Sequence, residues 1–277
     1  MRYPPATWRL LLESHPRPGP LNMAIDEAVL RSVASRKAPP TLRLYGWAPP
    51  ALTLGRGQPY ADADIDALRR QGITLLRRMT GGTAVLNRDE LTYTVAATVK
   101  EPRFSAPNIA ESYRGISGAL LVALERLGLV YAEASSRDET EATRPTRAAD
   151  RSPVCFEIPS DYEIIVEGRK LVGSSQMRVR DGILQHGSLP LTGDIADVSR
   201  FLTARPDPAR LRRAALTLHD AVGRLVTWEE AAEAILAGFR DVLNLTLIPS
   251  PLTPEERRAM ERLVLEKYAN EDWTARV

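Results

Sequence analysis

The stretch RRMTGGTAVLNRDELTYTV, residues 77–95, decides how the middle of the chain folds. Arg77 and Arg78 end a predicted strand, Gly81 and Gly82 lie in a turn, and two short strands follow around a second, polar turn. A double glycine permits positive φ and close approach of the backbone to a ligand, with N–H groups free to contact a carbonyl or a phosphate. A plain hairpin turn is the alternative. The adjacent arginines favour a ligand, because they repel each other unless an anionic or acidic group compensates.

Strands and helices are predicted to alternate on both sides of this stretch. Asn22 is expected to be a helix N-cap, Gly72 a helix stop, and Asn108 with Glu111 a capping box. The predicted strands cover residues 7–13, 40–47, 51–58 and 73–78, and the predicted helices cover residues 22–37, 62–72 and 108–128.

Residues 133–153 have almost no apolar content and predict a polar loop, which leads into Cys155, the only cysteine. Loops of that length in compact domains are usually functional or disordered. The run YEIIVEGRKLVGSSQMR then predicts a hairpin with its turn at Glu167–Arg169, and ILQHGSLPL predicts another strand. Helices follow, and two of them open with the T-x-x-E capping boxes Thr227–Glu230 and Thr253–Glu256.

These patterns predict one α/β (α+β) domain over residues 1–277. Strands dominate the middle of the chain and helices flank them, so we expect a mixed, largely antiparallel sheet flanked by helices. A C-terminal helix is expected over residues 253–270. We find no internal repeat and no interdomain linker.

The composition is that of an ordinary globular protein. Hydrophobic residues make up 44% of the chain and charged residues 26%, and the net charge of +2 argues against nucleic-acid binding by bulk charge. A single cysteine excludes an intrachain disulfide, so we expect a reduced thiol and a cytoplasmic protein. We find neither a signal peptide nor an apolar run of about twenty residues, and we expect no membrane-spanning segment.

Three residues in the second half are candidates for chemistry. A lone cysteine is often a small buried apolar residue, but Cys155 follows a polar loop and lies between prolines, which favours a reactive thiol. Lys170 is either a solvated lysine of the hairpin turn or a cation that lowers the pKa of a thiol, since the thiolate is the nucleophile. His186 is a base or a satisfied core histidine. We see no metal-ligand spacing and no phosphate-loop motif, and we expect neither metal nor cofactor.

Four stretches together resemble the catalytic domain of the lipoate–protein ligase/biotin ligase family. NMAIDEAVL, RRMTGGTAVLNRDELTYTV, YEIIVEGRKLVGSSQMR and LQHGSLPL occur in the family's order, over roughly residues 20–245. The run SPVCFEIPSDYEIIVEGRKLVGSSQ is most similar to the octanoyltransferases that use a cysteine. It departs at Ser175, where many relatives have alanine.

The resemblance implies the roles of the site residues. Cys155 is expected to form an acyl thioester, and Lys170 to lower the pKa of its thiol and to hold the acyl carbonyl. The other expected site residues bind the substrate around an acyl pocket, and they are Arg77, Arg78, Gly81, Gly82, Gly173, Ser174 and His186.

The resemblance also implies the partners. A monomer is expected to take octanoyl from acyl carrier protein and to transfer it to a lysine of a lipoyl domain, typically that of the glycine-cleavage H protein. Such partners are generally acidic, and a basic run is a candidate contact, the alternative being a solvated helix end. The run consists of Arg200, Arg205, Arg210, Arg212 and Arg213.

Three rival functions stay open. An ATP-dependent lipoate or octanoate ligase would pass through an acyl-adenylate and need no cysteine. An amidotransferase would move octanoyl between lipoyl domains and would also use a cysteine thioester. A non-catalytic binder of lipoyl domains or acyl groups belongs to another class, and Cys155 together with Lys170 argues against it.

Overall fold

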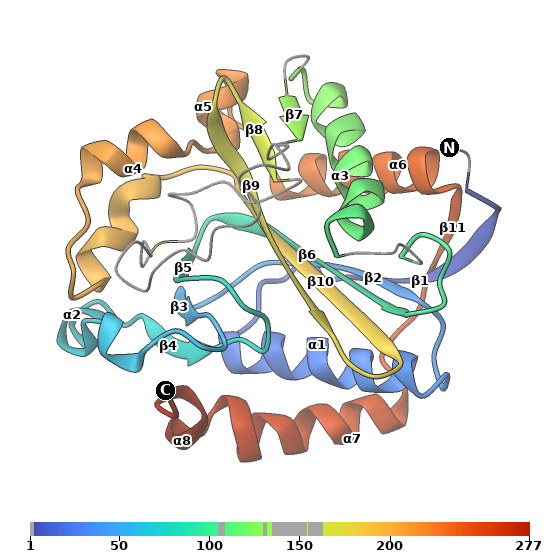
Figure 1. The fold of residues 1–277 in the computed structure, drawn as a ribbon, viewed down its shortest axis with the longest axis horizontal. Helices are drawn as coiled ribbons and strands as arrows, with labels where there is room; N and C mark the ends of the chain where they lie inside the picture. Colours follow the sequence, from blue (N-terminus) through green and yellow to red (C-terminus); the bar gives the residue numbers. More distant parts are fainter. Residues whose placement is uncertain (1–2, 105–108, 130–131, 135–153, 155–162) are drawn as a thin grey trace.

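The computed structural model describes residues 3–104, 109–129, 132–134, 154 and 163–277. An eight-stranded sheet forms its centre (Figure 1). In spatial order its strands are β11 (Leu245–Pro249), β1 (Ala6–Leu12), β2 (Thr41–Tyr45), β6 (Glu90–Thr98), β10 (Gly182–Pro190), β9 (Arg169–Arg178), β8 (Ile164–Val166) and β7 (Ala132–Ala134). β1 is parallel to both of its neighbours, and the other pairings are antiparallel. The predicted mixed, largely antiparallel sheet is confirmed.

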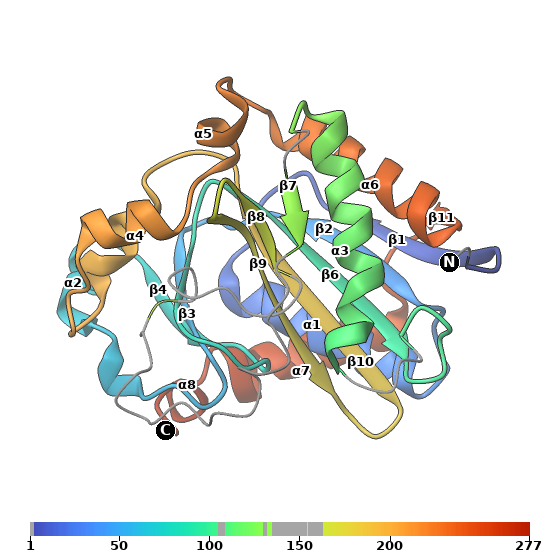
Figure 2. The same ribbon diagram turned by 45° about the horizontal axis from the view of Figure 1, so that its top comes forward.

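Helices cover both faces of this sheet (Figures 1 and 2). α3 (Ile109–Arg126) and α6 (Trp228–Leu243) share one apolar core with Leu10 of β1, whereas α1 (Gly19–Ala34) shares another with Leu11. Consecutive side chains of a strand point to opposite faces, so the two cores lie on opposite sides of the sheet.

A second, three-stranded sheet lies beside the large one and was not predicted as a separate sheet. It consists of β4 (Thr74–Arg77), β3 (Ala51–Leu54) and β5 (Val85–Asn87). The elements that pack around it are α2 (Ile65–Arg70), the 3-10 helix η3 (Ile195–Phe201) and α4 (Pro208–Ala214). Leu52, Leu68 and Phe201 meet in its own apolar core. Two short helical elements, η1 (Tyr60–Asp62) and α5 (Leu218–Val222), follow β3 and α4 in the chain.

The C-terminal segment packs across α1 and onto the end of β4. It consists of α7 (Pro254–Leu263), the π-helical turn η4 (Val264–Tyr268) and α8 (Glu271–Thr274). The predicted Thr253–Glu256 capping box is present, and Glu256 also binds Arg9 through two hydrogen bonds of 2.7 Å. Burial raises the pKa of Glu256, but the hydrogen bonds from Arg9 and from the Thr253 backbone outweigh it and lower the pKa.

Four local expectations differ from the structure. Asn22 lies inside α1, where its buried amide donates to the Gly46 carbonyl, and Pro18 is the N-cap. Residues 133 and 134 belong to β7 rather than to a loop. Thr227 caps α6, but the Glu230 carboxylate binds Arg224, so the capping box is incomplete. Strand β11 was not predicted at all. Asn108 lies outside the described residues, and the side chain of residue 111 is not described.

Candidate active site

A pocket with about 410 Å³ of empty space, part of it open to solvent, lies between the two sheets and the start of α1. Met23, Tyr45, Trp47 and Val85 give it apolar walls. Its polar lining comes largely from strand ends and the middle of β9 and β10, including Arg78, Gly173, Ser174, Ser175 and His186. A narrow, mostly apolar pocket with few convergent polar groups is the usual form of a small-molecule site.

The Gly81–Gly82 turn is hydrogen-bonded to two residues that line this pocket, Arg78 and Ser175. Arg78 stabilises the turn, because its guanidinium donates to the Gly81 carbonyl at 2.7 Å and to the Thr83 carbonyl at 2.9 Å. Ser175 Oγ of β9 donates to the same Gly81 carbonyl at 3.1 Å. Gly82 has a φ of 86°, in the left-handed region that favours glycine. In the described part of the chain, no backbone carbonyl accepts the amide of Gly81 or Gly82, and both residues are exposed.

Arg77 is turned away from the pocket, unlike its neighbour Arg78. It is fully buried, and its guanidinium donates to the carbonyls of Gly55 at 2.7 Å, Gln58 at 2.5 Å and Thr274 at 2.9 Å. Burial lowers the pKa of Arg77, and the positive charges of two neighbouring arginines lower it further. The side chain of Arg77 therefore joins the loop after β3 to α8. It can influence the pocket only by fixing the position of that loop.

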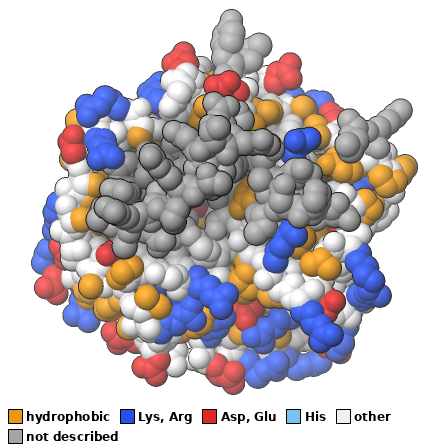
Figure 3. Space-filling model, viewed as in Figure 1, with side chains coloured by type: hydrophobic (Ala, Val, Ile, Leu, Met, Phe, Trp, Pro, Cys, Tyr) orange, Lys and Arg blue, Asp and Glu red, His pale blue; other side chains and the backbone are white. Residues whose placement is uncertain are grey.

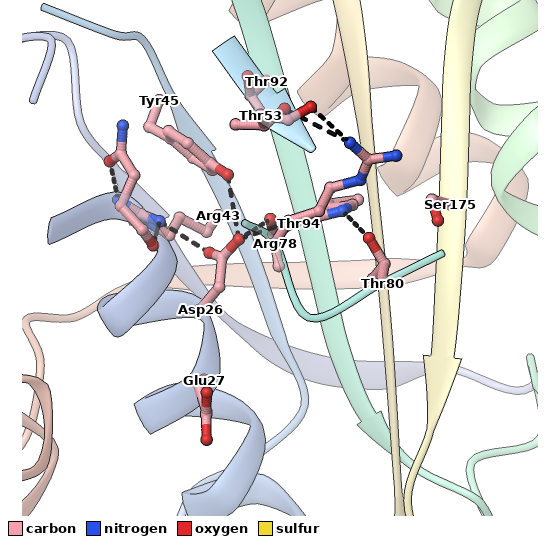
Figure 4. A network of polar contacts seen from close by, with 12 residues as sticks. Asp26, Glu27, Arg43, Tyr45, Thr53, Arg78, Thr80, Thr92, Thr94 and Ser175 are labelled. Carbon is pink, nitrogen blue, oxygen red and sulfur yellow. Dashed lines mark hydrogen bonds and ion pairs between the residues drawn. The ribbon is translucent and has the colours of Figure 1, made fainter. Parts of the chain in front are cut away.

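His186 lines the pocket and contacts Thr80 and Asp26. Its Nε2 lies 2.6 Å from Thr80 Oγ1, and its Nδ1 lies 3.6 Å from Asp26 Oδ2. Figure 4 shows the polar network around Asp26, with Arg43, Tyr45 and Thr94 labelled. Arg43, Tyr45 and Thr94 also donate to the Asp26 carboxylate, at 2.7–3.0 Å. Burial raises the pKa of Asp26, but Arg43 and His186 outweigh it, so the pKa is lowered and the carboxylate stays ionised. Sequence reasoning missed Asp26 and Thr80.

A buried carboxyl group supports the far wall of the pocket. Glu90 accepts hydrogen bonds from Asn87 at 3.1 Å, from Ser188 at 2.6 Å and from Thr92, which in turn accepts one from Trp47 at 2.7 Å. Those four donors line the pocket, and Glu90 lies behind them. Burial raises the pKa of Glu90, although the hydrogen bonds oppose it. Glu90 was expected only as part of a polar turn.

Lys170 is buried and paired rather than solvated. The β8–β9 hairpin turns at Glu167 and Gly168, which have φ values of 51° and 73°, so Lys170 lies just inside β9. Its Nζ lies 2.5 Å from Glu163 Oε1, and both side chains are almost completely inaccessible to solvent. The two other predicted residues of β9, Gly173 and Ser174, line the pocket.

Cys155 lies outside the described residues, as do residues 135–153 of the predicted polar loop. The residue before it, Val154, is described and buried, and it pairs in parallel with Ala84. Ala84 follows the Gly81–Gly82 turn by two residues. Val154 therefore lies alongside the segment that carries the turn.

Most arginines of the basic run after β10 form ion pairs with nearby carboxylates of the same chain. Each of the following arginines lies within ion-pair distance of a carboxylate: Arg200 with Asp197, Arg205 with Asp64, Arg212 with Asp194 and Arg213 with Asp207. This arrangement favours the solvated helix end over a contact for acidic partners.

Comparison with known proteins identifies the class. Residues 18–240 match the family model of the lipoyl protein ligase A/B catalytic domain. The octanoyltransferase LipM of Symbiobacterium thermophilum is 42% identical over 280 residues, covering 97% of this chain and 98% of the relative. That of Bacillus subtilis is 36% identical over 96% of this chain and 97% of the relative.

Solved structures share the fold. A putative lipoate protein ligase from Thermoplasma acidophilum, with bound lipoic acid, superposes with a TM-score of 0.78 at 24% identity, over 98% of this chain and 100% of the other. A lipoate-protein ligase A bound with ATP gives 0.79 at 24% identity, over 98% and 99%.

The chain belongs to the lipoyl protein ligase A/B catalytic-domain family. Within that family it is an octanoyltransferase, because its similarity to proteins of that name extends over nearly the whole of both chains. No helix in the described part of the chain is long and apolar enough to cross a membrane.

Proposed function

We propose that this enzyme takes octanoyl from acyl carrier protein, holds it as a thioester on Cys155 and transfers it to a lysine of a lipoyl domain, such as that of the glycine-cleavage H protein. The observation that carries the proposal is the pairing of Val154 with Ala84, whose neighbour in the chain, Val85, lines the apolar pocket. An eight-carbon acyl chain suits walls formed by Met23, Trp47 and Val85. The whole chain acts as one catalytic domain.

The first step makes the acyl-enzyme. The Cys155 thiolate attacks the thioester carbonyl of the donor, the new carbon–sulfur bond forms, and the carrier's sulfur leaves and takes up a proton. Negative charge develops on the carbonyl oxygen in between. The amides of Gly81 and Gly82 are suitable donors to that oxygen, since the Gly81 carbonyl is already held by Arg78 and Ser175.

The second step releases the acyl group. The ε-amine of the acceptor lysine attacks the acyl-Cys155 carbonyl, an amide bond forms and the Cys155 thiolate leaves, while the amine loses a proton. The thioester supplies the driving force for the amide, so no ATP is consumed. Donor and acceptor bind in turn, which gives ping-pong kinetics.

We propose that Lys170, which is ion-paired with Glu163, stabilises negative charge on the reacting groups. Its ammonium group stabilises the thiolate and the developing oxyanion, and Glu163 holds it in place at 2.5 Å. A buried charge is costly unless a hydrogen-bonded partner of opposite charge compensates it. Glu163 therefore keeps the cation available inside the protein.

Octanoylation of a purified lipoyl domain tests the proposed function. The protein is incubated with octanoyl-carrier protein and the acceptor domain, without ATP, and the mass of the acceptor is measured. We expect the acceptor to gain one octanoyl group, and the Cys155→Ala variant to give none.

Two other outcomes identify the rivals. If the acceptor is modified only when free octanoate and ATP are supplied, the protein is a ligase. If only an octanoylated lipoyl domain serves as donor, it is an amidotransferase.

A further inference from the structure

Two exposed arginines, Arg56 and Arg276, lie next to each other near the Gly81–Gly82 turn and are not assigned to the reaction above. The amide of Arg56 donates to the Thr80 carbonyl at 2.8 Å, which fixes it beside the Gly81–Gly82 turn. Its guanidinium reaches across to β9, where NH1 lies 4.0 Å from Met177 Sδ. Met177 follows the pocket residue Ser175 by two positions, so Arg56 spans the distance from the turn to β9.

Arg276, which belongs to the C-terminal segment, contacts Arg56. Its guanidinium donates to the Arg56 carbonyl at 3.1 Å and stacks on the Trp273 ring, with Cζ 3.6 Å from the ring centroid. Trp273 is fixed in turn, because its Nε1 donates to the Arg77 carbonyl at 2.9 Å. We call Arg56 and Arg276 the arginine rim. In the view of Figure 3, basic side chains, with acidic ones among them, lie on the lower part of the molecule.

The arginine rim carries a concentrated positive charge. In the described residues, the contacts of Arg56, Arg77 and Arg276 are with carbonyl oxygens, a sulfur and aromatic rings, and none is with a carboxylate. Burial lowers the pKa of Arg276, and the charge of Arg56 lowers it further. Cations gathered without acidic partners repel one another, and an anion bound among them removes that repulsion.

We propose that the arginine rim binds the phosphate of the pantetheine arm that carries the octanoyl group into the pocket. This inference rests on the proposed function, because it concerns the same acyl donor. Acyl thioesters used in biosynthesis are carried on pantetheine whose other end bears a phosphate, and an arm that brings its thioester to the pocket past the Gly81–Gly82 turn passes the arginine rim. The planar fork of arginine matches phosphate oxygens in pairs, and stacking on Trp273 pre-orients one of the two guanidinium groups.

The phosphate has two possible sources, an arm attached to carrier protein and an arm that is part of coenzyme A. Four donors separate the contributions: octanoyl-pantetheine, octanoyl-4′-phosphopantetheine, octanoyl-coenzyme A and octanoyl-carrier protein. The rate of octanoyl addition to the enzyme is followed by mass spectrometry at increasing donor concentration. We expect a KM about tenfold lower for the phosphorylated arm than for pantetheine, because a charge-assisted arginine–phosphate contact is among the stronger hydrogen bonds.

Variants assign the effect to the rim. Arg56→Gln and Arg276→Gln are each expected to raise KM for the phosphorylated donors about tenfold and to leave KM for octanoyl-pantetheine unchanged. The control is Arg224→Gln, whose side chain binds Glu230 on another surface, and it should change neither value. The donor with the lowest KM identifies the source of the phosphate.

The proposal is overturned if pantetheine and phosphopantetheine donors have the same KM, or if the rim variants affect both equally. Its failure is distinguishable from that of the proposed function. An enzyme that accepts octanoyl-pantetheine but ignores the phosphate keeps its function and loses this inference, whereas an enzyme acylated by none of the four donors loses both.

Discussion

Lys170 and Glu163 form a buried pair whose net charge is close to zero. A lone ammonium group would lower the pKa of a neighbouring thiol strongly, but Glu163, 2.5 Å away, offsets part of that effect. In the proposed mechanism, the pair therefore sets the reactivity of the Cys155 thiol through the difference between two opposite charges. Replacing Lys170 and replacing Glu163 should therefore change the reactivity of the Cys155 thiol in opposite directions.

Alkylation of Cys155 measures this balance. Lys170→Met is expected to slow the reaction with iodoacetamide at neutral pH several-fold, because it removes the cation that favours the thiolate. Glu163→Gln is expected to accelerate it, because the ammonium charge is no longer offset. The exposed turn residue Glu167 provides the control Glu167→Gln, which should leave the rate unchanged. An unaltered rate in Lys170→Met would contradict the role given to Lys170.

Glu90 and Glu256 are buried carboxyl groups with opposite pKa shifts. The pKa of Glu90 is raised from its ordinary value of 4.5, so its folded form binds a proton more tightly than the unfolded chain and loses stability as pH rises above 4.5. The pKa of Glu256 is lowered from 4.5, so its contribution is present above 4.5 and is lost as pH falls through the folded pKa.

Urea unfolding of Glu90→Gln and Glu256→Gln across this pH range tests both signs. Relative to wild type, the free energy of unfolding of Glu90→Gln should improve as pH rises above 4.5, because glutamine carries no charge to desolvate. That of Glu256→Gln should worsen relative to wild type as pH rises towards 4.5 from below, and should change little above 4.5. A difference from wild type that does not change with pH in either variant would show that the pKa shift at that residue is absent.

At the scale of elements, the pocket depends on close contact between two loops. The loop after β3 touches the Gly81–Gly82 turn so closely that a Cβ atom on Gly55 would lie 1.8 Å from the Gly82 carbonyl oxygen. No side chain fits there unless the backbone moves. The same loop supplies the carbonyls that Arg77 binds and carries Arg56.

Gly55→Ala is expected to reduce octanoyl transfer by at least about tenfold, because the displaced turn no longer aligns its amides with the acyl carbonyl. Gly57→Ala is a matched control in the same loop, since a Cβ there would meet nothing within 4 Å. Rates with octanoyl-carrier protein decide between them. Equal rates in the two variants would mean that the contact does not position the turn.

Local patterns predicted most elements but not all of their ends. The hairpin Ile164–Arg178 and the strand Gly182–Pro190 follow from glycine turns and apolar runs that the sequence displays. Strand β11 was missed because Leu245–Pro249 is short and directly follows a helix, and it is stabilised by parallel pairing with β1, more than two hundred residues away. Asn22 has the residue type of a cap, but tertiary contacts with Gly46 and Arg43 use its amide inside the helix.

Across the whole molecule, the fold class follows from the sequence. The set of residues that forms the site follows from it only in part. The sequence predicted the mixed sheet, and of the predicted site residues Arg78, Gly173, Ser174 and His186 line one pocket. Gly81 is hydrogen-bonded to two of the residues that line it, Arg78 and Ser175. The partners that support them come from distant elements and carry no local signal. Asp26 of α1 lies beside His186 of β10. Glu163 can be recognised as the partner of Lys170 only from the structure, in which both side chains are buried. Arg77 looked equivalent to Arg78, yet adjacent residues near a strand end point in opposite directions.

The most direct test of the account is the site of acylation on the protein itself. The enzyme is incubated with octanoyl-carrier protein, without ATP and without acceptor, and its intact mass and peptides are measured. We expect one octanoyl group, on the peptide that contains Cys155, released by hydroxylamine and absent from Cys155→Ser. An octanoyl group on another residue, equal acylation of Cys155→Ser, or no acylation until ATP and free octanoate are added would contradict the account.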